Sequence, residues 1–222
     1  MGRKKNPSRR DPAALRGQMV QTQLVARGVR DPAVLRAMRE VPREAFVPQD
    51  VAPYAYADSA LPIQEEQTIS QPYIVALMTE ALELTPDDQV LEIGTGSGYA
   101  AAVLAQIADQ VYSVERHRKL AREARARFQE LGYENIHVRH GDGSLGWLEH
   151  APYEAIVVTA AAPDIPDPLR EQLAVGGRLV IPAGETRLHQ ILLRVRRTAE
   201  DRYEQENLGA VRFVPLIGEE GW

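Results

Sequence analysis

Short apolar runs recur along the middle of the chain, separated by segments of helical composition. Five of these runs have the length and the side chains of buried strands: 90–93, 110–114, 135–139, 155–159 and 177–182. Helices are predicted between them at 100–108, 118–131 and 166–173. This alternation of strands and helices predicts a parallel sheet wrapped by helices.

Two more apolar runs near the C-terminus change the strand direction expected at one end of the sheet. Residues 190–195 and 210–216 are predicted to be strands, and no helix-length crossover separates them. Parallel neighbours need such a crossover, whereas antiparallel neighbours do not. The pattern therefore predicts an α/β fold with a doubly wound, mostly parallel seven-stranded sheet and antiparallel C-terminal strands.

The N-terminal part is predicted to form a helical cap. Asp11 and Asp31 each stand directly before a proline, which places a capping acid next to a residue suited to the first helical turn. The first helix is expected to end at Gly28 and the second before Pro42. The proline-rich residues 42–67 show no sustained period, and their aromatic side chains favour an ordered loop.

Composition limits the number of domains and the kinds of partner. With 222 residues and 44% hydrophobic side chains, the chain can bury one core with a small appendage. We expect a disordered basic tail at 1–10 and one domain over 11–222, with 11–67 as the cap and 68–222 as the α/β core. A net charge of -5 does not suggest binding to nucleic acid or to an anionic membrane. Cysteine and a spanning apolar run are both absent, so we expect a soluble cytoplasmic protein.

The stretch Val90–Tyr99 joins a strand to a glycine-rich turn and then to the start of a helix. Its three glycines let the backbone approach a ligand closely, and the helix N-terminus offers free N–H groups. Together these features predict a nucleotide-type site. The match to the dinucleotide fingerprint is poor, because Tyr99 replaces the small sixth residue when Gly94 is taken as the first. The looser match from Gly96 begins two residues too late after the strand.

Two acidic residues follow at the ends of the next two strands. Glu115 stands about 20 positions beyond Gly94, where a carboxylate can accept the hydroxyl protons of a ribose. Asp142 lies between two glycines, where it would accept a hydrogen bond from the exocyclic amine of adenine. The simpler alternatives are a solvated acid at a helix start for Glu115 and a turn residue for Asp142. Acids and glycines at successive strand ends favour an adenosine site.

The chain carries four motifs at these strand ends: Val90–Tyr99, Val111–Glu115, Gly141–Gly143 and Gly176–Pro182. They resemble the successive motifs of class I S-adenosylmethionine-dependent methyltransferases. More narrowly, residues Gln67–Tyr73, Val90–Tyr99 and Val157–Pro163 resemble the protein-L-isoaspartate O-methyltransferase family, and the resemblance extends over about residues 15–217. The Thr-Ile-Ser-x-Pro pattern within 67–73 discriminates most, because the glycine loop occurs in many methyltransferases.

The resemblance implies a Rossmann-like methyltransferase fold with a catalytic core at 68–222, and a protein repair activity. The cofactor would be S-adenosyl-L-methionine, with S-adenosyl-L-homocysteine as product, and the acceptor the free α-carboxylate of an L-isoaspartyl residue in a damaged protein or peptide. Ser70 is implied as the catalytic residue near that carboxylate. Positions implied to bind the acceptor are Ser70, Gln71, Pro72, Tyr73, Val214 and Pro215. Positions implied to bind the cofactor are Thr68, Ile69, Glu92, Ile93, Gly94, Thr95, Gly96, Ser97, Gly98, Glu115, Arg116, Asp142 and Gly143.

The implied reaction needs little acid–base chemistry. An α-carboxyl group with a pKa of about 3.3–3.7 is ionised at pH 7, so the acceptor needs no general base. Ser70 would orient the carboxylate rather than attack it, although its place before Pro72 also suits a simple helix cap. The five histidines show no zinc-ligand spacing, so we predict no metal site.

Three other functions stay open at this point. A methyltransferase acting on RNA or on a small molecule would share the cofactor half, and only residues 67–73 and the C-terminal strand argue against it. A nicotinamide-dependent dehydrogenase is disfavoured by the glycine spacing and by the antiparallel end of the sheet. A catalytically silent binding protein is disfavoured by Ser70 beside an intact glycine loop. The expected partners are isoaspartyl proteins and peptides, and we expect a monomer.

Overall fold

A computed structural model describes residues 11–186 and 188–222. The large sheet consists of β3 Gln89–Ile93, β4 Gln110–Glu115, β5 Ile136–His140, β6 Tyr153–Val158, β7 Leu173–Thr186, β8 His189–Ala199 and β9 Arg202–Val211. The α-helices are α1 Pro12–Met19, α2 Pro32–Glu40, α3 Pro72–Ala81, α4 Tyr99–Ala105, α5 Arg118–Leu131 and α6 Asp167–Glu171. Two short strands, β1 Leu61–Pro62 and β2 Thr68–Ile69, form a separate antiparallel pair. No helix in the described ranges is long and apolar enough to cross a bilayer.

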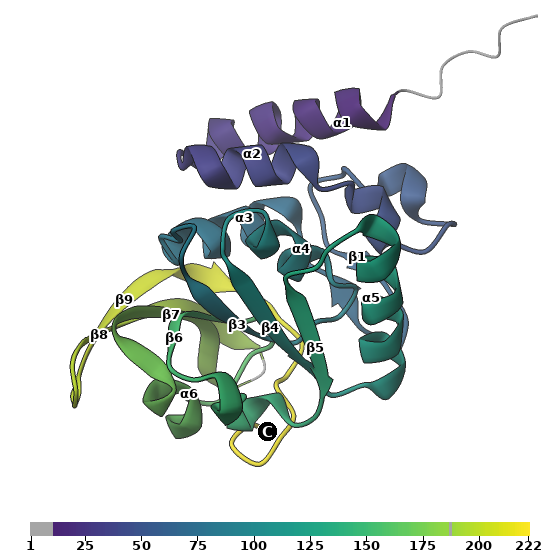
Figure 1. Ribbon diagram of the computed structural model, residues 1–222. Helices are drawn as coiled ribbons and strands as arrows, with labels where there is room; N and C mark the ends of the chain where they lie inside the picture. Colours follow the sequence, from purple (N-terminus) through teal and green to yellow (C-terminus); the bar gives the residue numbers. More distant parts are fainter. Residues whose placement is uncertain (1–10, 187) are drawn as a thin grey trace, which may run out of the picture.

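The strands of the large sheet lie in the order β5-β4-β3-β6-β7-β8-β9 (Figure 1). Neighbours from β5 to β7 run parallel, whereas β8 runs antiparallel to both β7 and β9. The predicted doubly wound sheet with antiparallel C-terminal strands is therefore confirmed. The tail predicted at 1–10 lies outside the described residues.

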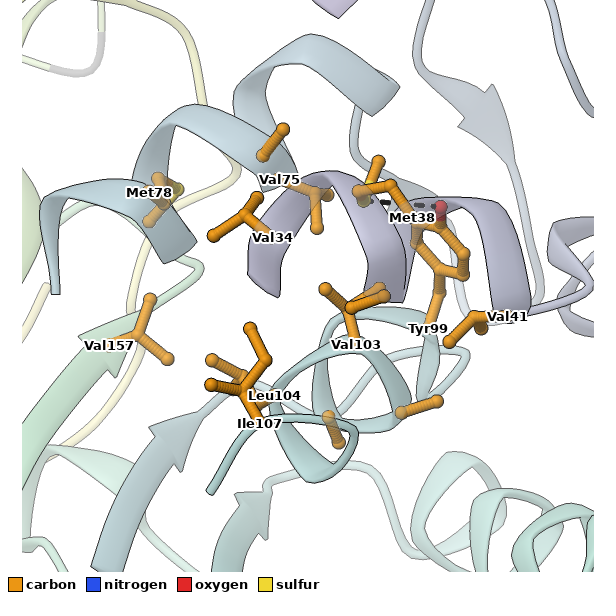
Figure 2. Close-up of a cluster of buried hydrophobic side chains, with 14 of the residues drawn as sticks. Val34, Met38, Val41, Val75, Met78, Tyr99, Val103, Leu104, Ile107 and Val157 are labelled. Carbon is orange, nitrogen blue, oxygen red and sulfur yellow. Dashed lines mark hydrogen bonds between the residues drawn. The ribbon is translucent and has the colours of Figure 1, made fainter. Parts of the chain in front are cut away.

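The sheet buries an apolar cluster on each face, because successive strand residues point to opposite sides. Val90 of β3 belongs to the cluster that includes residues of α3, α4 and α5, whereas its neighbour Leu91 belongs to the cluster that includes α6. Figure 2 shows the first cluster, where Val34 of α2 approaches Val75 of α3 and Val103 of α4. The cap thus forms an outer layer over α3 and α4 and shares one core with the sheet.

Both predicted helix starts in the cap are confirmed. The Asp11 carboxylate accepts a hydrogen bond from the N–H of Ala13 at 3.0 Å, and Asp31 accepts one from the N–H of Ala33 at 2.7 Å. These are N-cap bonds of the expected kind. After α1 the helical segment continues through a π-helical turn and a 3-10 turn. It ends, as predicted, at Gly28, whose φ of 102° lies in the left-handed region.

Residues 42–67 form an ordered connection, as predicted. The segment contains 3-10 turns at Arg43–Phe46 and Ala52–Tyr54, and the side chain of Phe46 is buried in the core. It then enters the β1–β2 hairpin, whose tight turn places both Glu65 and Glu66 at a positive φ of 57°. This hairpin brings the Thr-Ile-Ser-x-Pro stretch to the edge of the candidate site.

The last strand differs from the sequence prediction. The apolar pattern predicts a strand at 210–216, but β9 spans Arg202–Val211 and ends before most of that run. Side chains that face each other from β8 and β9 are largely polar, as in the pair of Arg194 with Glu206, so no apolar alternation marks this edge strand. Residues 212–216 instead turn toward the end of β6, where the N–H of Ala161 donates to the carbonyl of Val214 at 2.8 Å.

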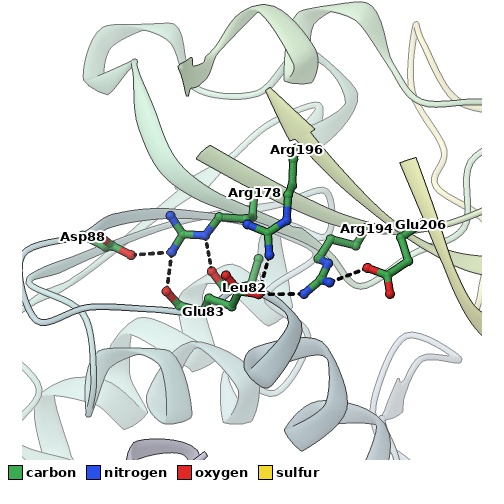
Figure 3. Close-up of polar contacts among 7 residues, drawn as sticks. All are labelled: Leu82, Glu83, Asp88, Arg178, Arg194, Arg196 and Glu206. Carbon is green, nitrogen blue, oxygen red and sulfur yellow. Dashed lines mark hydrogen bonds and ion pairs between the residues drawn. The ribbon is translucent and has the colours of Figure 1, made fainter. Parts of the chain in front are cut away.

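A cluster of charged side chains ties the end of α3 to the sheet (Figure 3). Arg178 of β7 donates to the carbonyls of Leu82 and Glu83 and pairs with Asp88 at 3.0 Å. The side chains of this ion pair are only 11% and 7% exposed. Glu83 also pairs with Arg194 of β8 at 2.9 Å. These contacts hold the C-terminal end of the helix whose other end carries the Ser70 segment.

Candidate functional site

A cavity of about 340 Å³ lies at the carboxyl ends of the parallel strands. Ligands of open α/β sheets bind in this place, and cavities for small molecules and cofactors span about 300–1,000 Å³. The cavity brings together seven of the predicted cofactor residues: Thr68, Ile93, Gly94, Gly96, Glu115, Arg116 and Gly143. Three more, Ile69, Thr95 and Ser97, line an adjoining hollow of about 50 Å³.

The glycine loop is held against the end of β6 by a residue that the sequence analysis missed. The hydroxyl of Thr159 donates to the carbonyls of Ile93 at 3.0 Å and Gly94 at 2.7 Å. A Cβ atom on Gly94, which has a φ of 96°, would lie 2.5 Å from that hydroxyl oxygen. Only glycine fits there. Thr159 directly follows an apolar strand within the motif 157–163, and this position could have marked it in the sequence as a site residue.

Glu115 is fixed in the cavity wall by two backbone donors. Its carboxylate accepts hydrogen bonds from the N–H of Gly96 and from the N–H of His117, both at 2.8 Å. The residue is only 5% exposed, so the carboxylate has little contact with bulk water. Each oxygen keeps a further lone pair, which suits a carboxylate that accepts two ribose hydroxyls. The alternative of a solvated surface acid is wrong.

Asp142 is not among the residues that line the cavity. Its carboxylate accepts hydrogen bonds from the N–H and hydroxyl of Ser144 and from the N–H of Glu219. Burial by itself would raise the pKa of Asp142, but the hydrogen bonds from Glu219 and Ser144 outweigh it and hold the pKa below its ordinary value. Asp142 is therefore a turn residue, as the simpler alternative predicted. The side chain anchors the C-terminal segment and places Gly143 in the wall, and its contact with adenine stays a prediction.

Glu92 and Gly98 also lie outside the cavity wall and support it from behind. Glu92 is fully buried, and its carboxylate accepts a hydrogen bond from Ser113, whose hydroxyl lies 2.6 Å from that of Thr95 in the glycine loop. A Cβ atom on Gly98 would lie 2.6 Å from the ring of Phe128 in α5. Both residues therefore shape the loop through packing and hydrogen bonds, and their direct contact with the cofactor stays a prediction.

We expect Glu92→Gln to remove a pH dependence of stability. Burial, more than the repulsion from Glu115, raises the pKa of Glu92 from 4.5 to about 8. A raised carboxyl pKa in the folded state gives stability that is present below pH 4.5 and is lost as the pH rises to about 8. The free energy of unfolding of the wild type should fall by up to about 1.4 kcal/mol per pH unit in this window relative to the variant. Urea denaturation at several pH values measures it, and identical slopes would contradict the raised pKa.

A second cavity of about 650 Å³ lies beside the first, between α3 and the end of β9 with the residues that follow it. Of the predicted acceptor residues, it is lined by Ser70, Gln71, Tyr73 and Val214. Pro72 is buried at the start of α3, and Pro215 lines the first cavity instead. Thr68 and Thr159 line both cavities and the hollow between them. The two cavities therefore adjoin each other at these two threonines.

Ser70 does not cap α3. The N-cap residue of the helix is Gln71, and no side chain makes a capping hydrogen bond there. Ser70 lines both the second cavity and the hollow that leads to the glycine loop. The helix-cap alternative is wrong, because Pro72 is the first helical residue and the N-cap position therefore falls on Gln71.

Fold and site together define a class. A parallel sheet with an antiparallel end, a Gly-x-Gly-x-Gly loop after the first strand of the core and an acid at the end of the next strand are the features of class I S-adenosylmethionine-dependent methyltransferases. The antiparallel β8 and β9 and the glycine spacing do not fit the dinucleotide-binding dehydrogenases.

Comparison with known proteins then gives the family. The family model described as protein-L-isoaspartate(D-aspartate) O-methyltransferase matches residues 16–221, and this chain belongs to that family. The chain is 63% identical to protein-L-isoaspartate O-methyltransferase 2 of Pelobacter propionicus over 97% of this chain and 96% of the relative. It is 64% identical to protein-L-isoaspartate O-methyltransferase 1 of Geotalea uraniireducens over 92% and 93%.

Solved structures agree with the family. A structure of a protein-L-isoaspartate O-methyltransferase superposes with a TM-score of 0.82 at 30% identity, covering 95% of this chain and 67% of that one. A putative member from Plasmodium falciparum, solved with S-adenosyl-L-homocysteine, gives a TM-score of 0.78 over 91% and 98%. Its identity is 24%, so this likeness supports the fold alone. The resemblance seen in the sequence is confirmed.

Proposed function

We propose that this chain transfers a methyl group from S-adenosyl-L-methionine to the free α-carboxylate of L-isoaspartyl residues in damaged proteins and peptides. The observation that carries the proposal is the pair of adjoining cavities. One is built by the glycine loop and the other by the Thr-Ile-Ser-x-Pro stretch, and they share Thr68 and Thr159. Donor and acceptor can therefore occupy separate cavities, with their reacting groups meeting beside these two threonines.

The residues of the first cavity fit the cofactor. Gly94 and Gly143 let the backbone of the cavity wall pack directly against Thr159 and Ile93, since a Cβ at either position would lie 2.5 Å from a neighbouring side chain. Glu115 would accept the ribose hydroxyls, and the loop from Gly94 to Ser97 would surround the amino-acid end of the cofactor. The bound cofactor supplies an activated methyl group on a positively charged sulfur.

The second cavity fits an extended peptide with an ionised carboxylate. The amide of Gln71 is held by Asp58 at 2.7 Å, and the ring of Tyr73 lies 3.5 Å from the guanidinium carbon of Arg27. These contacts fix the wall on both sides of Ser70. We assign to Ser70 the role of orienting the acceptor carboxylate by a hydrogen bond, with Gln71, Tyr73 and Val214 contacting the peptide.

A paired-peptide assay tests the proposed function. Two peptides of one sequence, with aspartyl or L-isoaspartyl at a single position, are incubated with the protein and methyl-labelled S-adenosyl-L-methionine. We expect label only in the isoaspartyl peptide, in a form released by mild alkali as a methyl ester would be. Equal labelling of both peptides, or none, would contradict the proposal. An RNA arm in the same assay tests the rival methyltransferase activity.

We expect Ser70→Ala to lower the turnover of isoaspartyl peptide by at least about tenfold, the loss of one hydrogen bond to a charged group. The dissociation constant of S-adenosyl-L-methionine should stay within about twofold of wild type, because the hydroxyl serves the acceptor side. Thr22→Ala, in the cap, is the control. Steady-state kinetics with calorimetry measures both quantities, and turnover at the wild-type level would remove Ser70 from the mechanism.

Cellular location and oligomeric state belong to the proposal as well. We propose a monomer that acts in the cytoplasm, where it meets the aged proteins that carry isoaspartyl residues. Size-exclusion chromatography with light scattering tests the monomer, and fractionation of the source cells tests the location.

A further inference from the structure

Arg43 lies in the cap behind residues 68–71, which comprise β2 and the two residues before α3 and are called here the acceptor turn. The residue is 0% exposed. Its Nε donates to the carbonyl of Ala55 at 2.8 Å, and its Nη2 donates to the carbonyl of Ser70 at 2.7 Å. The guanidinium carbon lies 4.6 Å from the ring centroid of Tyr99, the first residue of α4. Arg43 therefore links the loop before the hairpin, the acceptor turn and the helix that follows the glycine loop.

Stability alone does not explain a charge at this position. Removing a guanidinium from water is costly unless acids or a full set of hydrogen bonds compensate it. Within the described ranges no acidic side chain forms an ion pair with Arg43, and its Nη1 is buried without a hydrogen-bond partner. Burial lowers the pKa of Arg43, and the neighbouring Tyr99 side chain offsets only part of this effect. An apolar side chain of similar volume would avoid this cost.

What Arg43 holds is the backbone at Ser70. Helix α3 does not fix this residue, because the helix begins after Gln71. The Ser70 carbonyl belongs to the planar peptide unit that joins Ser70 to Gln71. A hydrogen bond that holds this plane restricts the backbone rotations on either side of it, and with them the directions of both side chains. Both side chains line the second cavity, called here the acceptor cavity.

We propose that Arg43 is a positioning residue for the methyl acceptor, acting through the Ser70 carbonyl. The proposal rests on the function proposed above, which places the acceptor carboxylate at Ser70. Arg43 itself is not among the residues that line the acceptor cavity. Its positive charge therefore does not contact the carboxylate, where it would hold the ground state more tightly than the transition state.

Three variants separate positioning from a merely structural role. Arg43→Met removes the charge and the hydrogen bonds at similar volume. Arg43→Lys keeps the charge but lacks the planar fork that serves two carbonyls at once. Arg178→Met is the matched control, because Arg178 is also a buried arginine that holds backbone carbonyls, but at the other end of α3. The readouts are kcat and KM for isoaspartyl peptide, the dissociation constant of S-adenosyl-L-methionine, and hydrogen exchange of residues 67–73.

For Arg43→Met we expect kcat/KM for the peptide to fall by at least about tenfold while the cofactor dissociation constant changes by less than about threefold. Exchange of the amides in 67–73 should become at least about tenfold faster, because the turn loses its anchor. For Arg43→Lys, kcat/KM and the exchange rate of 67–73 should both lie between those of the wild type and those of Arg43→Met. Arg178→Met should leave kcat/KM at its wild-type value in the folded protein, and any faster exchange that follows from its lower global stability should extend over α3 and the sheet rather than be confined to 67–73.

Wild-type kcat/KM together with wild-type exchange in Arg43→Met would overturn the proposal, and so would an equal loss in Arg178→Met. If Arg43→Met does not fold, Arg43→Lys decides by the same readouts. If the wild type does not methylate isoaspartyl peptide, the proposed function fails, but the exchange of 67–73 still decides the role of Arg43. Faster exchange in the variant then supports positioning, and unchanged exchange overturns it.

Discussion

Replacing Glu115 with leucine is expected to weaken the binding of S-adenosyl-L-methionine by about 1.5–3 kcal/mol, or about 10- to 150-fold in the dissociation constant. The carboxylate is held by the N–H groups of Gly96 and His117 at 2.8 Å, so it is already oriented before a ligand enters. Leucine would remove two acceptors from a cavity wall that is nearly closed to water. Titration calorimetry at fixed salt measures the change.

Glu130→Leu is the matched control for this experiment. It removes the same charge from an exposed position of α5, away from the cavity. We expect its affinity for S-adenosyl-L-methionine to equal that of the wild type. Unchanged affinity in Glu115→Leu would remove Glu115 from the ribose role and would return the choice of cofactor contacts to the rest of the cavity.

Replacing Arg178 with methionine is expected to lower the free energy of unfolding by about 3–5 kcal/mol, the usual effect of breaking a buried ion pair. Asp88 would keep its charge at 7% side-chain exposure without its partner at 3.0 Å. The carbonyls of Leu82 and Glu83, directly after α3, would also lose their donor (Figure 3). Urea denaturation at pH 7 measures the loss.

The double variant Arg178→Met with Asp88→Leu tests the cause. Removing both charges leaves no buried ion, so the double variant should be more stable than Arg178→Met alone. Asp88 also accepts hydrogen bonds from the N–H and the hydroxyl of Thr85, so the recovery should be partial. A loss below about 1 kcal/mol in the single variant would show that this pair behaves like a surface ion pair.

Local sequence rules predicted those parts of the fold that depend on periodicity and on helix termini. The strands β3, β4 and β6 are rich in apolar residues because both of their faces are largely buried, so the sequence identified them as strands. The hairpin partner β9 was misplaced because its side chains pair with polar neighbours at an edge and carry no apolar signal. Its stability comes from cross-strand pairing, which the linear pattern does not contain.

The sequence likewise predicted only part of the candidate site. The glycine loop and Glu115 lie in the cavity wall as predicted, because their placement depends on residue type and on distance along the chain, and their contacts with the cofactor stay predictions. Glu92 lies behind the loop, where it accepts a hydrogen bond from Ser113, and its predicted contact with the cofactor stays a prediction. Asp142 turned out to anchor the C-terminal segment, through the N–H of Glu219. The direction of a short acidic side chain depends on which backbone donors approach it, and those donors come from distant segments.

The sequence by itself determined the order of strands and helices up to β8, the position of the glycine loop and the family, because each is encoded by side chains that are neighbours along the chain. Only the tertiary structure decided that Thr68 and Thr159 stand between two adjoining cavities, that Ser70 is free of the helix cap, and that a buried Arg43 holds its carbonyl. These facts depend on contacts between segments that are far apart in sequence. Packing forms such contacts only after the cap, the hairpin and the sheet have come together.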